Sequence, residues 1–245
     1  MKFAIIGGTN IETLPIPYCE QAVSTPYGDA VVCRGKLEDG KEVLFLPRHG
    51  VLNDVDSCRI NYRANIFALH QLGVTHVIGV TRVGTCDYTF KLGSVCLVTD
   101  FIDFTRSRKS TFYREHRIAR HVSMENVFSP TMNDVLERCI TQSGLPYAGR
   151  TVYACTEGPR FETAAEVRML RMLGAQVVGM VMVPEAPLCR QLGMEYAGVC
   201  IVSNYCTGMA GEVRDENIRE IVLEHRADVF DLCFDLIRNA SQLEA

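Results

Sequence analysis

The chain of 245 residues lacks several patterns that would place it in a specialised class of protein. No stretch approaches the roughly 20 apolar residues that a membrane-spanning helix needs, and the apolar segment at the N-terminus is too short for a signal peptide. No Pro/Ser-rich or charged run marks a linker, and no internal repeat is visible. Because 47% of the residues are hydrophobic, the chain can bury a large core. We therefore expect one cytoplasmic domain spanning residues 1–245.

Charge and cysteine spacing exclude further classes. The net charge of -4 and the pI near 5.9 argue against nucleic acid or an acidic membrane as the main partner and favour a small-molecule ligand. The 11 cysteines include no CxxC pair and no Cys/His metal spacing. Several of them lie inside apolar runs, namely Cys96, Cys155, Cys200 and Cys233. We expect these four to be buried free thiols, and we expect no bound metal.

Short apolar runs alternate with amphipathic segments along the chain. Strands are predicted at residues 2–6, 30–34, 42–47, 76–80, 94–98, 151–155 and 196–202. Helices are predicted at residues 62–69 and 162–173, each followed by a glycine, from residue 184 onward, and along residues 218–236. Strands that alternate with helices indicate an α/β sheet covered on both faces.

The most informative segment, residues 153–207, carries polar side chains next to predicted strands and helices. Phe161 and Glu162 follow a Gly-Pro break at a helix entrance, and Asn204 follows the last buried strand, where α/β sheets tend to bind ligands. A carboxylate and a carboxamide beside an aromatic ring suit a 6-oxopurine, since Glu162 can accept from N1–H and Asn204 can donate to O6 or bond N7. Adenine would fit poorly because its N1 is an acceptor. The alternatives are a core role for Phe161, a helix-dipole role for Glu162 and a turn at Asn204.

Two other strand ends carry groups that suit an anion. The first predicted strand ends in Gly7-Gly8-Thr9-Asn10, whose amides and hydroxyl could hold an anion. This turn lacks GxGxxG, so a dinucleotide site has little support. Arg48 and His49 follow the strand at residues 42–47. From the residues alone, the alternatives are a surface ion pair for Arg48 and a hydrogen-bonded histidine at a strand end for His49.

Six short motifs together carry a resemblance to a known family. They are IIGGTN (residues 5–10), PRHG (47–50), INYRANIFAL (60–69), TEGPRFET (156–163), GMVMVPE (179–185) and VSNY (202–205). In these motifs, and over nearly its whole length, the chain resembles the trimeric purine nucleoside phosphorylases and the methylthioadenosine or methylthioinosine phosphorylases. The resemblance implies a nucleoside phosphorylase-like α/β fold in a single domain, with a central mixed twisted β-sheet flanked by helices.

The resemblance also implies roles for individual residues. Thr9, Arg48, His49, Thr81 and Arg82 would bind phosphate, the co-substrate, and no metal or organic cofactor is implied. Asn204, Glu162 and His49 would be the catalytic residues. On the substrate side, Phe161 would stack on the purine, Met180 would pack under the ribose, and His121 would reach the 5′ end from a neighbouring subunit. The last role implies an oligomer, and we expect a homotrimer.

Three departures from the family pattern concern the inferred phosphate and ribose region. Val181 stands where Ser or Thr is usual, Arg82 stands where a small residue is usual, and residues 51–56 replace a loop that contains histidine. Arg82 could replace the lost hydroxyl as a phosphate donor. It could instead fill the anion site, or pair with Asp54 or Asp56.

The sequence therefore predicts phosphorolysis of a 6-oxopurine nucleoside such as inosine, guanosine or 5′-methylthioinosine to the free base and a (5-methylthio)ribose-1-phosphate. The alternatives are a methylthioadenosine phosphorylase, a hydrolase, and a relative that binds purines without turnover because its phosphate site is altered. The sequence leaves the 5′ substituent, hydroxyl or methylthio, undecided.

Overall fold

The structure is a computed structural model that describes residues 1–113 and 121–243. Its strands are β1 (Phe3–Gly7), β2 (Tyr18–Thr25), β3 (Gly28–Lys36), β4 (Glu42–Pro47), β5 (His76–Thr85), β6 (Val95–Asp103), β7 (Tyr147–Cys155), β8 (Val177–Gly179) and β9 (Glu195–Tyr205). Its helices are α1 (Tyr62–Gln71), α2 (Pro130–Ser143), α3 (Ala164–Met172), α4 (Met182–Gln191), α5 (Asp215–Arg238) and the short 3₁₀ helix η1 (Ala240–Leu243). The predicted α/β class is confirmed.

The strands of the described residues form one mixed sheet in the order β2-β3-β4-β1-β5-β8-β7-β6-β9. The last strand also pairs with β5, so β5, β8, β7, β6 and β9 close into a ring. The expected mixed sheet is therefore observed, and this half of it is closed. β1, β4, β5 and β9 run parallel, and their carboxyl ends therefore meet at one edge.

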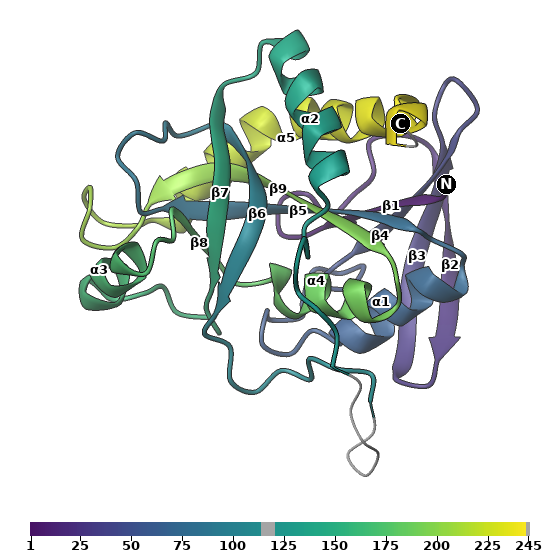
Figure 1. The fold of residues 1–245 in the computed structure, drawn as a ribbon, viewed down its shortest axis with the longest axis horizontal. Helices are drawn as coiled ribbons and strands as arrows, with labels where there is room; N and C mark the ends of the chain where they lie inside the picture. The colour runs from purple at the N-terminus through teal and green to yellow at the C-terminus, as the bar shows by residue number, and fades with distance from the viewer. Residues whose placement is uncertain (114–120, 244–245) are drawn as a thin grey trace.

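Helices cover both faces of the sheet (Figure 1). α1 and α4 lie on one side of it, α2 and α5 lie on the other, and α3 lies at the end near β7 and β8. β1 shows how the sheet serves both layers: Ala4 and Ile6 belong to the hydrophobic cluster under α1 and α4, while Phe3 and Ile5 belong to the cluster under α2 and α5. Because strand side chains alternate between faces, a fully apolar strand is what a sheet buried on both sides requires.

Several predicted elements differ from the observed ones at their ends. β5 continues past residue 80 and includes Arg82, and β9 continues past residue 202 and includes Asn204. α3 begins only after Thr163, which caps it: the Thr163 hydroxyl accepts from the Glu166 amide and Glu166 accepts from the Thr163 amide. Glu162 therefore lies just before the helix, whereas the sequence pattern placed it within the first turn.

Candidate functional site

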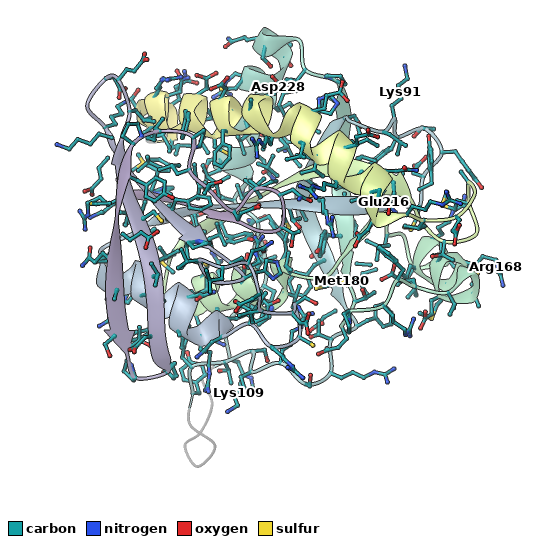
Figure 2. The ribbon with its side chains drawn as sticks, turned by 180° about the vertical axis from the view of Figure 1, so that it is seen from behind. Lys91, Lys109, Arg168, Met180, Glu216 and Asp228 are labelled. Atoms are coloured by element: carbon teal, nitrogen blue, oxygen red, sulfur yellow. The ribbon has the colours of Figure 1, made fainter. Side chains whose placement is uncertain are left out.

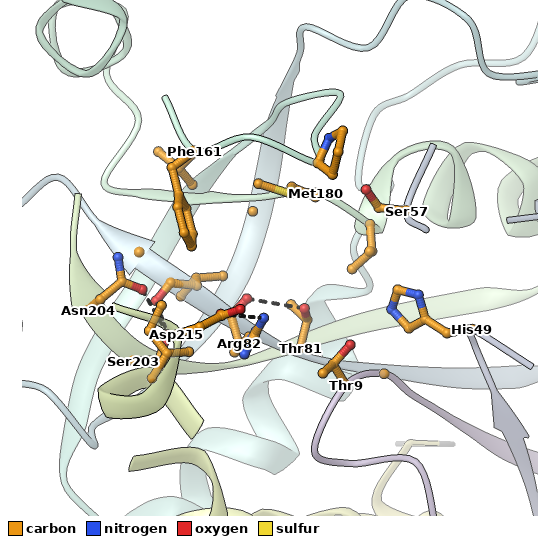
Figure 3. Close-up of a pocket in the computed structure, with 18 of the residues that line it drawn as sticks. Thr9, His49, Ser57, Thr81, Arg82, Phe161, Met180, Ser203, Asn204 and Asp215 are labelled. Atoms are coloured by element: carbon orange, nitrogen blue, oxygen red, sulfur yellow. Dashed lines mark hydrogen bonds and ion pairs between the residues drawn. The ribbon is translucent and has the colours of Figure 1, made fainter. Parts of the chain in front are cut away.

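The parallel strand ends border a cavity of about 370 Å³. The residues that line it come from the ends of β1, β4, β5, β8 and β9 and from the segment between β7 and α3. Of the side chains that the sequence assigned to a site, those lining it are Thr9, Arg48, His49, Thr81, Arg82, Phe161, Glu162, Met180 and Asn204. Figure 3 shows two separate ends, one with Phe161 and Asn204 and the other with Thr9 and His49.

The Phe161 end combines an aromatic ring, a carboxylate and a carboxamide, from Phe161, Glu162 and Asn204. Phe161 is 39% exposed, so its ring is available to a ligand and does not form part of the core. Glu162 is buried, and its Oε1 accepts a hydrogen bond of 2.6 Å from the Thr156 hydroxyl. No other described residue hydrogen-bonds to this carboxylate, so Oε2 can accept from a ligand.

Asn204 is oriented by its own strand. A register shift in the β5–β9 pairing leaves Ser203 opposite no partner, which is a β-bulge, and Asn204 pairs with Gly84. The Ser203 hydroxyl lies 3.0 Å from Asn204 Oδ1, and Asn204 Nδ2 donates to the Tyr205 carbonyl at 3.1 Å. This network assigns the amide orientation and leaves one Nδ2 hydrogen free to donate.

The other end, with Gly8, Thr9 and His49, has the features of an anion site. A side chain at Gly8 would place its Cβ 2.8 Å from Arg48 Nη1 and 3.2 Å from His49 Nε2, so the glycine lets these two groups approach the same backbone position without displacement. His49 Nδ1 donates to the Val55 carbonyl at 2.7 Å, which leaves Nε2 as the free ring nitrogen. Burial lowers the pKa of His49, an effect that the Val55 contact opposes. The ring is therefore neutral near pH 7.

Arg48 is used differently from the sequence expectation. Its Nε and Nη2 donate to the two carboxylate oxygens of Glu185 at 2.6 and 3.0 Å, and Nη1 donates to the Val80 carbonyl at 2.9 Å. Burial disfavours the guanidinium charge, but the adjacent Glu185 carboxylate outweighs it and raises the pKa of Arg48. The guanidinium fork thus binds Glu185 and not an anion. Its second Nη1 hydrogen remains, on the nitrogen that faces Gly8.

Arg82 pairs with neither Asp54 nor Asp56. Its Nη2 lies 3.3 Å from Asp215 Oδ1 at the start of α5, and its Nη1 lies 3.4 Å from Asn10 Oδ1. The contacts are long and the side chain is partly exposed, so the guanidinium is held loosely at the wall of the cavity. Thr81, the preceding residue, also lines the wall, and its hydroxyl donates to the Arg82 carbonyl at 3.2 Å.

Met180 and Val181 form the wall between the two ends. Met180 is half-buried and lies near the middle of the view in Figure 2, whereas the labelled Lys91, Lys109 and Arg168 lie toward its edges. Val181 is buried and caps α4 without a side-chain hydrogen bond, as expected when a hydroxyl residue is replaced by valine. His121 is exposed and is not among the cavity residues of this single chain. Its assigned contact across a subunit boundary stays a prediction.

Sequence reasoning missed several contributors to the site. Thr156 supports Glu162, and Ser57 lines the cavity from the segment before α1. Asp215 lines it as well and holds Arg82. The Thr156 hydroxyl was visible in the TEGPRFET motif, but nothing local in the sequence indicates that Ser57 or Asp215 reaches the same cavity.

The remaining features bear on metals and membranes. All cysteines are free, and the four singled out from the sequence are buried, as predicted. Within residues 1–113 and 121–243, no three His, Cys, Asp or Glu residues are grouped so that they could hold a metal ion. In the same residues, no helix has both the length and the apolarity to cross a bilayer.

Comparison with solved structures supports the fold. A methylthioadenosine phosphorylase from Schistosoma mansoni, solved with adenine, superposes with a TM-score of 0.92 at 24% identity and covers 98% of this chain and 91% of its own. A methylthioadenosine phosphorylase from an antarctic soil metagenomic library gives a TM-score of 0.91 at 29% identity, with coverage of 100% and 88%. Because the Schistosoma mansoni protein is only 24% identical to this chain, that match supports the fold alone.

Sequence comparison is more specific. The chain is 41% identical to a 6-oxopurine nucleoside phosphorylase from Pyrococcus furiosus, over 94% of this chain and 90% of the relative. It is 41% identical to a probable S-methyl-5′-thioinosine phosphorylase from Methanothermobacter thermautotrophicus, over 96% and 83%. It is 39% identical to an S-methyl-5′-thioadenosine phosphorylase from Pyrococcus horikoshii, over 93% and 88%. The model of one family, the Phosphorylase superfamily, matches residues 2–238. With this match and these relatives, the chain belongs to the Phosphorylase superfamily.

Proposed function

We propose that this protein cleaves 6-oxopurine nucleosides with inorganic phosphate, releasing the purine and a ribose-1-phosphate. The observation that carries the proposal is that one cavity holds both the Glu162 carboxylate and the Asn204 amide. The carboxylate has a free acceptor oxygen, and the amide has a free donor hydrogen. A 6-oxopurine offers N1–H as a donor and O6 and N7 as acceptors, which match these groups. Relatives named for 6-oxopurine and methylthioinosine substrates support the same choice.

The chemistry follows from the two ends of the cavity. Cleavage of the N-glycosidic bond builds positive charge on the ribose and negative charge on the departing purine. Asn204 would donate to O6 or N7 as that negative charge develops, Glu162 would anchor N1–H, and Phe161 would stack on the base. Met180 would pack under the ribose. Phosphate would attack the anomeric carbon from the opposite side of the sugar.

The anion end would hold that phosphate with fewer charged donors than the motif alone implied. Thr9 would supply a hydroxyl, and so would Thr81 once its hydroxyl turns from the Arg82 carbonyl to the phosphate. Arg48 would supply the single remaining Nη1 hydrogen, and Arg82 a loosely held positive charge. The neutral His49 would accept a hydrogen bond at Nε2 from a protonated phosphate oxygen. Positioning the two reactants in one cavity would supply most of the rate enhancement.

We further infer a homotrimer located in the cytoplasm, with phosphate as co-substrate and no other cofactor. The eleven free thiols fit a reducing compartment. Met169, Met172 and Leu173 at α3 are exposed apolar side chains, and Tyr88, also exposed, lies under the Arg171 guanidinium of the same helix; a subunit contact over these four apolar residues would cover them. A neighbouring subunit would bring His121 to the 5′ end of the substrate.

The direct test is release of purine from inosine, guanosine, methylthioinosine and methylthioadenosine, with and without phosphate. We expect phosphate-dependent turnover, with the 6-oxopurine nucleosides preferred over methylthioadenosine. Turnover that does not need phosphate would assign a hydrolase, and purine binding without turnover would assign a silent relative. Preference for methylthioadenosine would transfer the assignment to the 6-aminopurine class.

The role of Arg82 is tested in the same assay. Its loose pairing with Asp215 predicts that the guanidinium turns to the phosphate when the anion binds. We expect Arg82→Ala to raise the phosphate KM by about 10-fold, because one charged hydrogen bond is worth roughly 1.5–3 kcal/mol. Faster turnover of Arg82→Ala at low phosphate would show instead that Arg82 obstructs the anion site.

A further inference from the structure

Arg108 lies outside the cavity, yet it contacts three segments that form the walls around the nucleoside. It follows β6, and its side chain is 1% exposed. We propose that Arg108 is a positioning residue that holds these walls at the spacing needed by the nucleoside, and that it acts on nucleoside binding and not on phosphate binding. The inference rests on the proposed function for the identity of the ligand, but the contacts stand independently of it.

The first contact is with the end of β7. Arg108 Nη2 donates to the carbonyls of Thr156 and Glu157 at 3.2 and 2.8 Å. The chain then turns at Gly158-Pro159 and delivers Phe161 and Glu162 to the cavity. Thr156 also supports Glu162 through its hydroxyl. One guanidinium nitrogen therefore fixes the backbone from which both base-facing side chains are placed.

The second and third contacts use the other nitrogen. Arg108 Nη1 donates to the Val183 carbonyl at 2.6 Å, three residues after Met180 at the start of α4. It also lies 3.1 Å from the Tyr62 hydroxyl, which donates to the Ser57 carbonyl at 2.8 Å. Met180 and Ser57 both line the cavity, and Figure 3 shows them on the same side of it.

The electrostatic setting explains why arginine is suited to this position. The planar guanidinium presents five N–H groups in a rigid fork, so it can bind carbonyls from several directions at once. It also stacks over the Tyr62 ring at 5.3 Å. The balancing carboxylate is Glu157, 3.9 Å from Arg108 Nε, and it is held by the Arg106 amide and the Ser107 hydroxyl. Lysine would retain the charge but could not serve all of these carbonyls.

Among the residues that the structure describes, no hydrogen bond of Arg108 reaches the anion end directly. Thr9 follows β1 and His49 follows β4, and in the described chain Arg108 hydrogen-bonds to neither segment nor to Arg82. A purely structural arginine would affect folding, with no reason to separate the two substrates. A positioning role predicts that separation.

The experiment measures KM for inosine and for phosphate in Arg108→Met and Arg108→Lys. We expect the inosine KM to rise about 10- to 100-fold in Arg108→Met and less in Arg108→Lys, with the phosphate KM changed by no more than about twofold, because misplacement of about 1 Å can cost that much. Lys41→Met is the control. Lys41 also donates to two backbone carbonyls, those of Ile237 and Arg238, but it lies before β4 and away from the cavity, so both KM values should stay as in the wild type.

Tyr62→Phe provides a test that keeps the fold. It removes only the hydroxyl that joins Arg108 to Ser57, and we expect a smaller rise in the inosine KM alone. An equal rise in both KM values, or an unchanged inosine KM in folded Arg108→Met, would overturn the proposal. Wild-type protein without phosphorolysis would overturn the proposed function instead. In that case, the role of Arg108 is tested by calorimetric titration with hypoxanthine. A positioning role requires that Arg108→Met bind hypoxanthine more weakly than the wild type does.

Discussion

Asn204 is the residue whose chemistry most directly determines which purine can bind. In Asn204→Asp, the free amide donor is replaced by a carboxylate that can only accept. We expect kcat/KM for inosine to fall by about 10-fold or more, since a hydrogen bond to a group that becomes charged is worth roughly 1.5–3 kcal/mol. Activity on methylthioadenosine should fall less, because the 6-amino group can donate to the new carboxylate. The measurement is the ratio of kcat/KM values for the two nucleosides.

Ser203→Ala is the control for this substitution. The hydroxyl lies against Asn204 Oδ1, so its loss removes one of the two hydrogen bonds that orient the amide without changing the amide itself. We expect a smaller loss on inosine and an unchanged order of preference. If Asn204→Asp leaves the base preference as it was, Asn204 does not contact the base.

At the scale of single elements, the sequence was most informative where a strand is buried on both sides. β1 is buried along its whole length and was predicted almost to the residue. β2 was not predicted, because it is an edge strand with mostly exposed side chains and lacks any apolar pattern. α2 was also missed, although Ser129 caps it and Gly144 ends it in the left-handed conformation.

The use of Arg48 could not have been predicted from local patterns. Its partner Glu185 is far away in the sequence and comes from α4, so only the tertiary fold shows that the arginine fork is already occupied. The Tyr196 hydroxyl, from β9, also donates to Glu185 at 2.8 Å. The buried pair thus joins the end of β4 to α4 and β9 behind the anion end of the cavity.

Glu185→Gln tests how much the buried Arg48–Glu185 pair stabilises the protein. The substitution keeps the shape of the side chain but leaves the Arg48 charge buried without a counter-ion. We expect the free energy of unfolding to fall by roughly 3 kcal/mol or more, as for other buried pairs that lose one partner. Urea denaturation followed by circular dichroism gives the value.

Glu212→Gln is the control, because the Glu212 pair with Arg214 is largely exposed. Its effect should stay within about 1 kcal/mol, the range of surface ion pairs. Similar losses in the two variants would mean that the Arg48 pair contributes no more than a surface contact.

On the scale of the whole molecule, closure of the β5–β9 ring makes one site out of distant segments. Glu162 follows β7 and Asn204 belongs to β9, and both strands are in that ring. The sequence predicted that Glu162 and Asn204 face one pocket because Glu162 stands at a helix entrance and Asn204 at the carboxyl end of a buried strand, and both do line the same cavity. It did not predict the closure, because each strand shows only its own burial and not the strand with which it pairs.

The exposed surface of Tyr88, Met169, Met172 and Leu173 leads to a prediction about assembly. Met172 is 81% exposed, which is unusual for a side chain of this size in a protein that acts as a monomer. We expect the wild-type protein to sediment at three times the 27.3 kDa of one chain. Met172→Asp should shift it toward the monomer, because burying an unpaired carboxylate in a subunit contact is costly.

Analytical ultracentrifugation of the wild type and Met172→Asp shows whether this surface is buried between subunits or stays exposed to solvent. Leu223→Asp is the control, since Leu223 is an exposed apolar residue on α5, outside the surface defined by Tyr88, Met169, Met172 and Leu173. It should leave the trimer intact. Because His121 would complete the site from a neighbouring subunit, dissociation in Met172→Asp should also raise the nucleoside KM. A wild-type monomer with full activity would remove both the trimer and the role of His121.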